Sequence, residues 1–281
     1  CNQMFWLAGS MRTYKIPGDL LQQINDVIKT AEKTRFFSEI LSTETVIGDL
    51  EDFSKIPITP LNRYRRQKFA DVVANPADID WIIGPHRGYS VDSLAIAEGM
   101  NEAEYRYDLF GDAVKGLLDL RKIRSSVVVA SPNRRQFGAE VATMLIYLGL
   151  PSHLFIDYGD ERTYERLIHV DPDILVLTDF LDERLLPSGI SLCITFRCSQ
   201  EITRFPQLDM FLINELGFLG QTADFRIYSL NRDVYYFEIS ERGNLIVTSL
   251  YNRVQPLLRL ETSDVVQQVD RDMVELVRLL E

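Results

Sequence analysis

The feature that most constrains the fold is an alternation of strand-like and helix-like segments between Ser125 and Thr178. The β-branched run "SSVVVAS" is typical of a buried strand, and "SHLFI" and "DILVL" have the same character further along the chain. Two amphipathic segments separate them: "QFGAEVATMLIYLG", and "DERTYERLIHV" with Asp160 as its predicted N-cap. This order predicts a parallel sheet with right-handed crossovers. The residues predicted to face inward from the first helix are Phe137, Val141, Met144, Ile146 and Leu148.

The two ends of the chain have different patterns. From Asp19 to about Leu41 the apolar residues recur at helical spacing, which predicts an amphipathic helical opening. A further strand is expected at 190–196, and the last third contains short β runs separated by turns, "FRIYSL", "VYYFEIS" and "LIVTSLY". We therefore expect an α/β fold in which a mostly parallel layered sheet with flanking helices is followed by a smaller antiparallel β region.

The charge of the chain argues against nucleic acid or an acidic membrane as a partner. The 281 residues carry a formal net charge of -11, and no basic stripe could neutralise a row of phosphates. The densest basic stretch, "NRYRRQKFADVV" at 62–73, is interpreted as the solvated face of a helix. The apolar run in "CNQMFWLAGSMR" at the start of the sequence is too short to span a bilayer.

Cysteine and histidine usage predicts no metal site. The three cysteines include only one close pair, Cys193 and Cys198, and none of the three histidines belongs to a metal-binding spacing. We expect no disulfide framework, no structural zinc and a reducing cytoplasmic location. The alternative is an exported lipoprotein with Cys1 at its mature N-terminus.

Segments near the end of the chain carry a family resemblance. "GNLIVTSL" and "QPLLRLETSD" resemble the "GeLvvTsL" and "PliRYrtgD" segments that close the large domain of the adenylate-forming enzymes, specifically the phenylacetate-CoA ligase-like branch. "LEDFSKIPITP" resembles a segment near the start of that domain, and "PDILVL" resembles one of its strands. The resemblance covers about 35–266 and is strongest at 137–180 and 236–264.

The resemblance also implies a domain organisation. Residues 1–266 would form the large domain, with an irregular segment at 1–18. The remaining residues, 267–281, contain "VDRDMVELVRLLE" and are expected to form a C-terminal helix with Val274, Val277 and Leu280 facing inward. The small C-terminal domain of the family, which carries its catalytic lysine, is expected to be absent.

The resemblance implies a nucleotide site. By this resemblance, Asp264 matches the aspartate that binds the ribose hydroxyls of ATP. An aspartate suits that role because a carboxylate can accept both hydroxyl hydrogens of a vicinal diol. Arg259 matches the neighbouring arginine, although Leu260 stands where the family has tyrosine. Gly217, Gly138 and Ser90 complete the candidate cofactor-binding residues, and ATP or AMP is the implied cofactor. The alternative is that Asp264 is an ordinary turn carboxylate.

Other parts of the family chemistry are missing from the sequence. The phosphate loop should fall between 82 and 95, where "IIGPHRGYSVDSLAI" lacks a compact run of small residues. Aligned on Gly217, the threonine and magnesium-binding glutamate of the family correspond to Leu219 and Gly220. Glu215 is assigned to helix capping or to solvent. No catalytic residue and no magnesium site are predicted. Arg134 and Arg135 follow a strand, where they could bind an anion or lie in a solvated loop.

Three functions remain open. The first is a noncatalytic relative of AMP-forming acyl-CoA ligases that binds a nucleotide, a small acidic or acyl ligand, or a protein partner. The second is an active ATP-dependent carboxylate-activating ligase whose small domain comes from another chain or from outside this fragment. The third is an unrelated α/β binding protein. The oligomeric state is left open.

Overall fold

The computed structural model describes residues 18–41, 45–84, 94–197, 200–223, 227–270 and 272–278. Among these, the α-helices are α1 (Leu20–Ala31), α2 (Arg35–Ser38), α3 (Leu50–Ser54), α4 (Leu61–Arg65), α5 (Phe69–Val72), α6 (Met100–Lys115), α7 (Arg135–Tyr147) and α8 (Glu161–Val170). The 3-10 turns are η1 (Pro76–Asp78), η2 (Leu120–Lys122), η3 (Pro132–Arg134) and η4 (Glu183–Leu185). The strands are β1 (Thr59–Pro60), β2 (Trp81–Ile83), β3 (Ile96–Glu98), β4 (Ser126–Ala130), β5 (Ser152–Ile156), β6 (Ile174–Leu177), β7 (Leu192–Phe196), β8 (Gln207–Ile213), β9 (Gly217–Thr222), β10 (Ile227–Leu230), β11 (Tyr235–Ile239), β12 (Asn244–Ser249), β13 (Leu260–Asp270) and β14 (Met273–Arg278).

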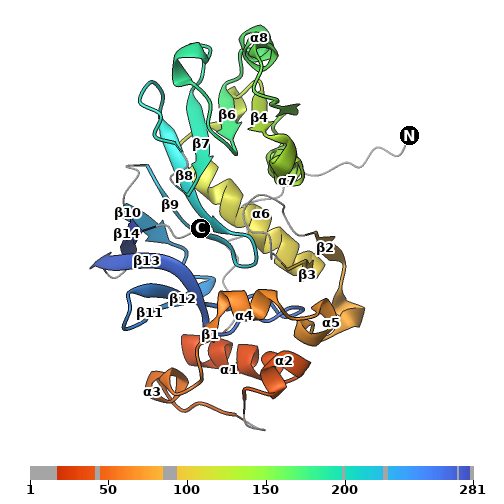
Figure 1. The fold of residues 1–281 in the computed structure, drawn as a ribbon, viewed down its shortest axis with the longest axis vertical. Helices are drawn as coiled ribbons and strands as arrows, with labels where there is room; N and C mark the ends of the chain where they lie inside the picture. The colour runs from red at the N-terminus through yellow and green to blue at the C-terminus, as the bar shows by residue number, and fades with distance from the viewer. Residues whose placement is uncertain are drawn as a thin grey trace.

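The predicted parallel sheet is confirmed. Strands β5, β4, β6, β7 and β8 lie side by side in that order, and each neighbouring pair is parallel. The predicted helices between them are α7 and α8, and Asp160 caps α8 by accepting from the backbone N–H of Arg162 at 3.2 Å. Figure 1 shows these strands and helices at one end of the molecule.

Alternating side chains of the parallel strands build two cores. Val128 points to the face covered by α6 and α7, whereas Val127 and Val129 point to the opposite face, where Leu167 of α8 packs. Both faces are buried, which explains the continuous β-branched character of "SSVVVAS". Ile146, predicted to face inward from α7, is 58% exposed, so that part of the helix prediction was wrong.

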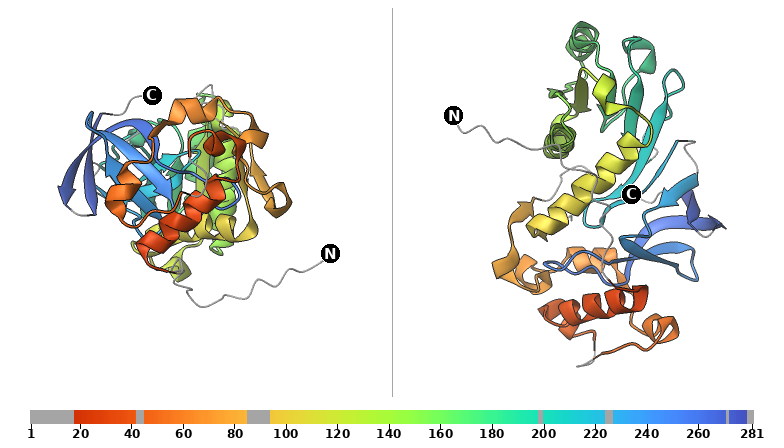
Figure 2. Two further views of the ribbon diagram at one scale, coloured as in Figure 1. Left: turned by 90° about the horizontal axis from the view of Figure 1, so that it is seen from below. Right: turned by 180° about the vertical axis from the view of Figure 1, so that it is seen from behind.

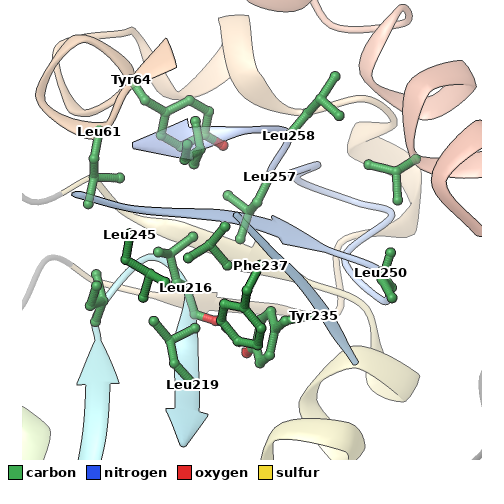
Figure 3. Packing of buried hydrophobic residues seen from close by; sticks show 14 of the residues in the cluster. Leu61, Tyr64, Leu216, Leu219, Tyr235, Phe237, Leu245, Leu250, Leu257 and Leu258 are labelled. Carbon is green, nitrogen blue, oxygen red and sulfur yellow. Dashed lines mark hydrogen bonds between the residues drawn. The ribbon is translucent and has the colours of Figure 1, made fainter. Parts of the chain in front are cut away.

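The antiparallel region continues the same sheet. Strand β9 pairs antiparallel with β8, and β10, β14, β13, β12 and β11 follow in that order. With β1, which pairs parallel with β13 beside this path, the strands form one 12-stranded sheet. Helices α1 to α4 contribute to the core beneath the antiparallel strands, at the far end of the molecule from the parallel strands in Figures 1 and 2. Figure 3 shows part of this core, with Leu216 and Leu219 beside Tyr235 and Phe237.

The predicted C-terminal helix at 267–281 was wrong. Residues Met273–Arg278 form β14, which pairs antiparallel with β13 on one side and β10 on the other. Val274 is buried, whereas Val277 is 59% exposed, so the two valines do not share an inward face. Although the apolar residues have helical spacing, this segment forms a strand because its backbone hydrogen-bonds to both β13 and β10. Leu280 lies outside the described residues. The same holds for the predicted irregular segment at 1–18, except for Gly18. No helix among those described has the length and apolarity needed to cross a membrane.

Candidate functional site

Two arginine–carboxylate pairs lie where the parallel strands end. Arg197 directly follows β7, and its Nη2 forms an ion pair with Oδ1 of Asp264. Glu215 follows the end of β8, and both its carboxylate oxygens accept from Arg65 at 2.8 Å. Because β7 and β8 are parallel, their carboxyl ends meet at one edge of the sheet, where α/β proteins bind ligands. We call these four residues the arginine–carboxylate cluster.

Asp264 lies within β13 and not beyond a strand. Only 2% of its surface is exposed, and its backbone N–H donates to Oγ1 of Thr262 at 3.2 Å. Burial raises the pKa of Asp264, while the charges of Arg197 and Arg65 act in the opposite direction. The influence of Arg65 on this carboxyl places the two ion pairs within one electrostatic environment. Asp264 is therefore a buried, paired carboxylate, and its role in binding ribose stays a prediction.

Arg197 is held in an unusual backbone conformation. Its φ is 54°, in the left-handed region that non-glycine residues rarely adopt, and its N–H donates to the carbonyl of Met210 at 2.9 Å. Its Nε is buried without a hydrogen-bond partner in the described part of the chain. Sequence reasoning gave Arg197 no role, because its partner is 67 residues away in the sequence.

The assignment of Glu215 to helix capping or solvent was wrong. The Glu215 side chain is fully buried, and the bidentate contact with Arg65 of α4 compensates for the loss of water. The basic stretch at 62–73 therefore includes a buried ion pair as well as solvated residues. Beside this pair, the amide oxygen and nitrogen of Asn214 are buried and have no partner among the described residues.

Arg259 has a structural role. Its guanidinium donates to both carboxylate oxygens of Glu238, at 3.0 and 2.8 Å, and to the carbonyl of Ser54 at 2.7 Å. It also contacts the carbonyl of Ile56, and it is 4% exposed. These contacts fix α3 against β11 and β13. The assignment of Arg259 to cofactor binding stays a prediction.

Of the other predicted cofactor residues, Gly217 lies two residues after Glu215, at the start of β9, whereas Gly138 lies within α7. Gly138 allows α7 to pack on the sheet, since an added Cβ would lie 2.7 Å from Cβ of Ala130. Gly217 has a φ of 83°, and an added Cβ would lie 2.9 Å from the hydroxyl of Tyr235. Ser90 and most of the predicted phosphate loop lie outside the described residues.

The positions aligned with the family's metal-binding motif are packed inside the sheet. Leu219 is fully buried. A Cβ on Gly220 would lie 2.4 Å from the backbone oxygen of Ser229 and 3.2 Å from Cα of Leu230, so β9 and β10 approach too closely for a side chain. The described residues contain no group of His, Cys, Asp or Glu suited to a metal ion.

Arg134 contacts the loop that follows β6. Its Nη1 donates to the carbonyl of Thr178 and lies 3.3 Å from Oδ1 of Asp179, while Arg135 is exposed at the start of α7. These contacts favour the solvated-loop interpretation over an anion site.

No protein-family profile and no curated protein matches the sequence. The fold matches a solved 2-hydroxyisobutyryl-CoA ligase in complex with 2-HIB-AMP and CoA, with a TM-score of 0.68 and 16% identity, over 91% of this chain and 65% of that one. The chain has the fold of an adenylate-forming ligase.

Two other ligase structures share this fold. An acyl acid amido synthetase in complex with 2,4-DB matches with a TM-score of 0.56 and 11% identity, over 91% of this chain and 67% of that one. The amide bond synthetase from Marinactinospora thermotolerans matches with a TM-score of 0.50 and 13% identity, over 73% and 49%. The chain spans 65% of the length of the CoA ligase, less than two thirds of it.

Proposed function

We propose that this chain is a noncatalytic relative of the AMP-forming acyl-CoA ligases, in the phenylacetate-CoA ligase-like branch, and that it functions by binding a small carboxylate or acyl ligand. The proposal that the chain is noncatalytic rests on the close packing of β10 against Gly220 of β9. Adenylation joins a carboxylate to the α-phosphate of ATP with loss of pyrophosphate, and it depends on a metal and cations at the phosphates. The position matched to the magnesium-binding glutamate has no room even for a methyl group.

The arginine–carboxylate cluster supports the proposed ligand class. The side chains of Arg65 and Arg197 are 21% and 20% exposed, whereas those of Glu215 and Asp264 are 0% and 2% exposed. The cations therefore lie on the solvent side of their carboxylates. A carboxylate approaching this edge of the sheet meets guanidinium groups first, and a guanidinium binds a carboxylate through two parallel hydrogen bonds.

An active ligase is the second candidate. It is supported by the match of 91% of this chain to a CoA ligase solved with an adenylate and CoA. In this case ATP would be the cofactor, and a separate segment or chain would supply the remaining catalytic groups.

Pyrophosphate exchange is the direct test for adenylation by this chain on its own. The purified chain is incubated with ATP, Mg²⁺, labelled pyrophosphate and a panel of short-chain and aromatic carboxylic acids. The noncatalytic proposal expects no exchange above that of heat-denatured protein for any acid. Acid-dependent exchange would establish the ligase instead.

Binding of the same acids is measured by isothermal titration. Arg65→Ala and Arg197→Ala are expected to weaken it at least tenfold, because each removes a cation from the solvent side of the cluster. Arg124→Ala is the matched control, since Arg124 also pairs with a carboxylate, Asp173 at 2.9 Å, but elsewhere. Equal affinity in all four proteins would show that the ligand does not bind at the cluster.

A further inference from the structure

Asp264, which matches the ribose-binding aspartate of the family, is already paired with an arginine of its own chain. Oδ1 of Asp264 is paired with Nη2 of Arg197. To bind a vicinal diol, a carboxylate must accept from both hydroxyls at once, which requires both oxygens to face the ligand. With 2% of its surface exposed, Asp264 offers no accessible pair of oxygens while Arg197 remains in place.

The local backbone directs Arg197 to this position. Arg197 is the first residue after β7, its φ is 54°, and its N–H is fixed to Met210 on the neighbouring strand. Arg65, the second cation of the cluster, acts on the same carboxyl from α4. Two elements far apart in the sequence therefore supply positive charge to Asp264.

We propose that Arg197 is an internal substitute for a ribose: its guanidinium occupies Asp264 and excludes adenine nucleotides from a site that the fold would otherwise offer them. Arg197 is thus the specificity-determining residue of the arginine–carboxylate cluster. It removes Asp264 as an acceptor for hydroxyl groups and presents a cation to solvent in its place. This inference rests on the proposed binding function, and adenine nucleotides are the ligand class that the cluster excludes.

The test is a gain of binding. AMP and ATP, each with and without Mg²⁺, are titrated into the wild-type chain, Arg197→Gly, and the double variant Arg197→Gly with Asp264→Asn. Glycine suits the positive φ at this position. We expect no saturable binding by the wild type up to millimolar nucleotide, and an affinity at least tenfold higher in Arg197→Gly. The double variant should lose this gain, because the amide of asparagine no longer accepts on both of its polar atoms.

Folding is checked by circular dichroism, since Arg197→Gly leaves a buried carboxylate without its cation. Arg197→Gln is the second variant, because it removes the charge and keeps a polar side chain of moderate length; it should also gain affinity. Arg124→Ala serves as the control for loss of an arginine–carboxylate pair elsewhere, and it should gain nothing.

Two results would overturn the inference. One is nucleotide binding by the wild type as tight as that of Arg197→Gly. The other is a folded Arg197→Gly or Arg197→Gln that is less stable than wild type but gains no affinity, which would make the pair purely structural. Acid-dependent pyrophosphate exchange by the wild type would overturn the noncatalytic function and this inference together, because exchange requires bound ATP. A folded variant that gains no affinity, with no exchange by the wild type, would overturn this inference alone.

Discussion

Arg259, the residue before β13, donates to both carboxylate oxygens of Glu238 on β11, although β12 lies between these two strands in the sheet. The same guanidinium contacts carbonyls at the end of α3 and lies 5.4 Å from the ring centroid of Phe53. One side chain thus links the sheet to the N-terminal helices.

Arg259→Ala is expected to reduce the free energy of unfolding by about 3–5 kcal/mol, because it leaves the partly buried Glu238 carboxylate and several carbonyls without their donor. Urea unfolding followed by circular dichroism measures this loss. Arg184→Ala is the control, since its ion pair with Asp182 is largely exposed and its removal should cost far less. Similar losses for the two variants would contradict a structural role for Arg259.

Gly220→Ala should reduce the free energy of unfolding by about 1–3 kcal/mol, the usual cost of forcing an extra methyl group into a packed interior. The new Cβ would lie 2.4 Å from a backbone oxygen of β10, which cannot move without disturbing the sheet. Thermal and urea unfolding provide the measurement. Gly48→Ala is the matched control, since its nearest contact is a carboxylate oxygen of Asp52 at 3.5 Å. A stable Gly220→Ala would remove the steric argument against a metal-binding side chain there.

Glu98 gives a pH dependence of known sign. Burial raises the pKa of Glu98 above its ordinary value of 4.5, with the Arg106 charge acting in the opposite direction. The folded chain therefore binds a proton on Glu98 more readily than the unfolded chain does. Its contribution to stability is present below about pH 4.5 and is lost as pH rises through the higher folded pKa. Urea unfolding of wild type and Glu98→Gln between pH 4 and 7 should show stability falling more steeply with pH in the wild type; parallel curves would contradict this.

Cys193 is expected to be unreactive in the native protein. Burial raises the pKa of its thiol to about 12, and the charges of Asp209 and Glu183 add to the effect. Iodoacetamide at pH 8 should leave Cys193 unmodified under native conditions and modify it in urea, as read by peptide mass spectrometry. Free glutathione added to the same reaction reports the activity of the reagent. Rapid native modification would show that this part of the sheet opens.

Local patterns made the parallel half of the fold predictable. Strands β4 and β6 are buried on both faces, which explains their continuous apolar character, whereas β5 lies at the edge of the sheet and is only partly buried. The same reasoning failed at the C-terminus, since the spacing of Val274 and Val277 fits a helix while the free edges of β13 and β10 favour a strand. Nothing local to 273–278 reveals those edges.

The arginine–carboxylate cluster was only partly predictable. Asp264 was found through a family resemblance, but its partner Arg197 is 67 residues away, and Arg65 is 150 residues from Glu215. The sequence around each arginine is that of an ordinary surface residue. Pairing over such distances depends on the tertiary fold and leaves no signal in residue spacing.

The parallel and antiparallel strands form one uninterrupted hydrogen-bonded sheet, and the cluster lies where the two kinds of strand meet. Strand β8 belongs to both halves, because it is parallel to β7 and antiparallel to β9. Separating the halves would require breaking that ladder along its length. The two halves should therefore melt in a single transition, and a ligand bound at the cluster would raise the melting temperature of both by the same amount.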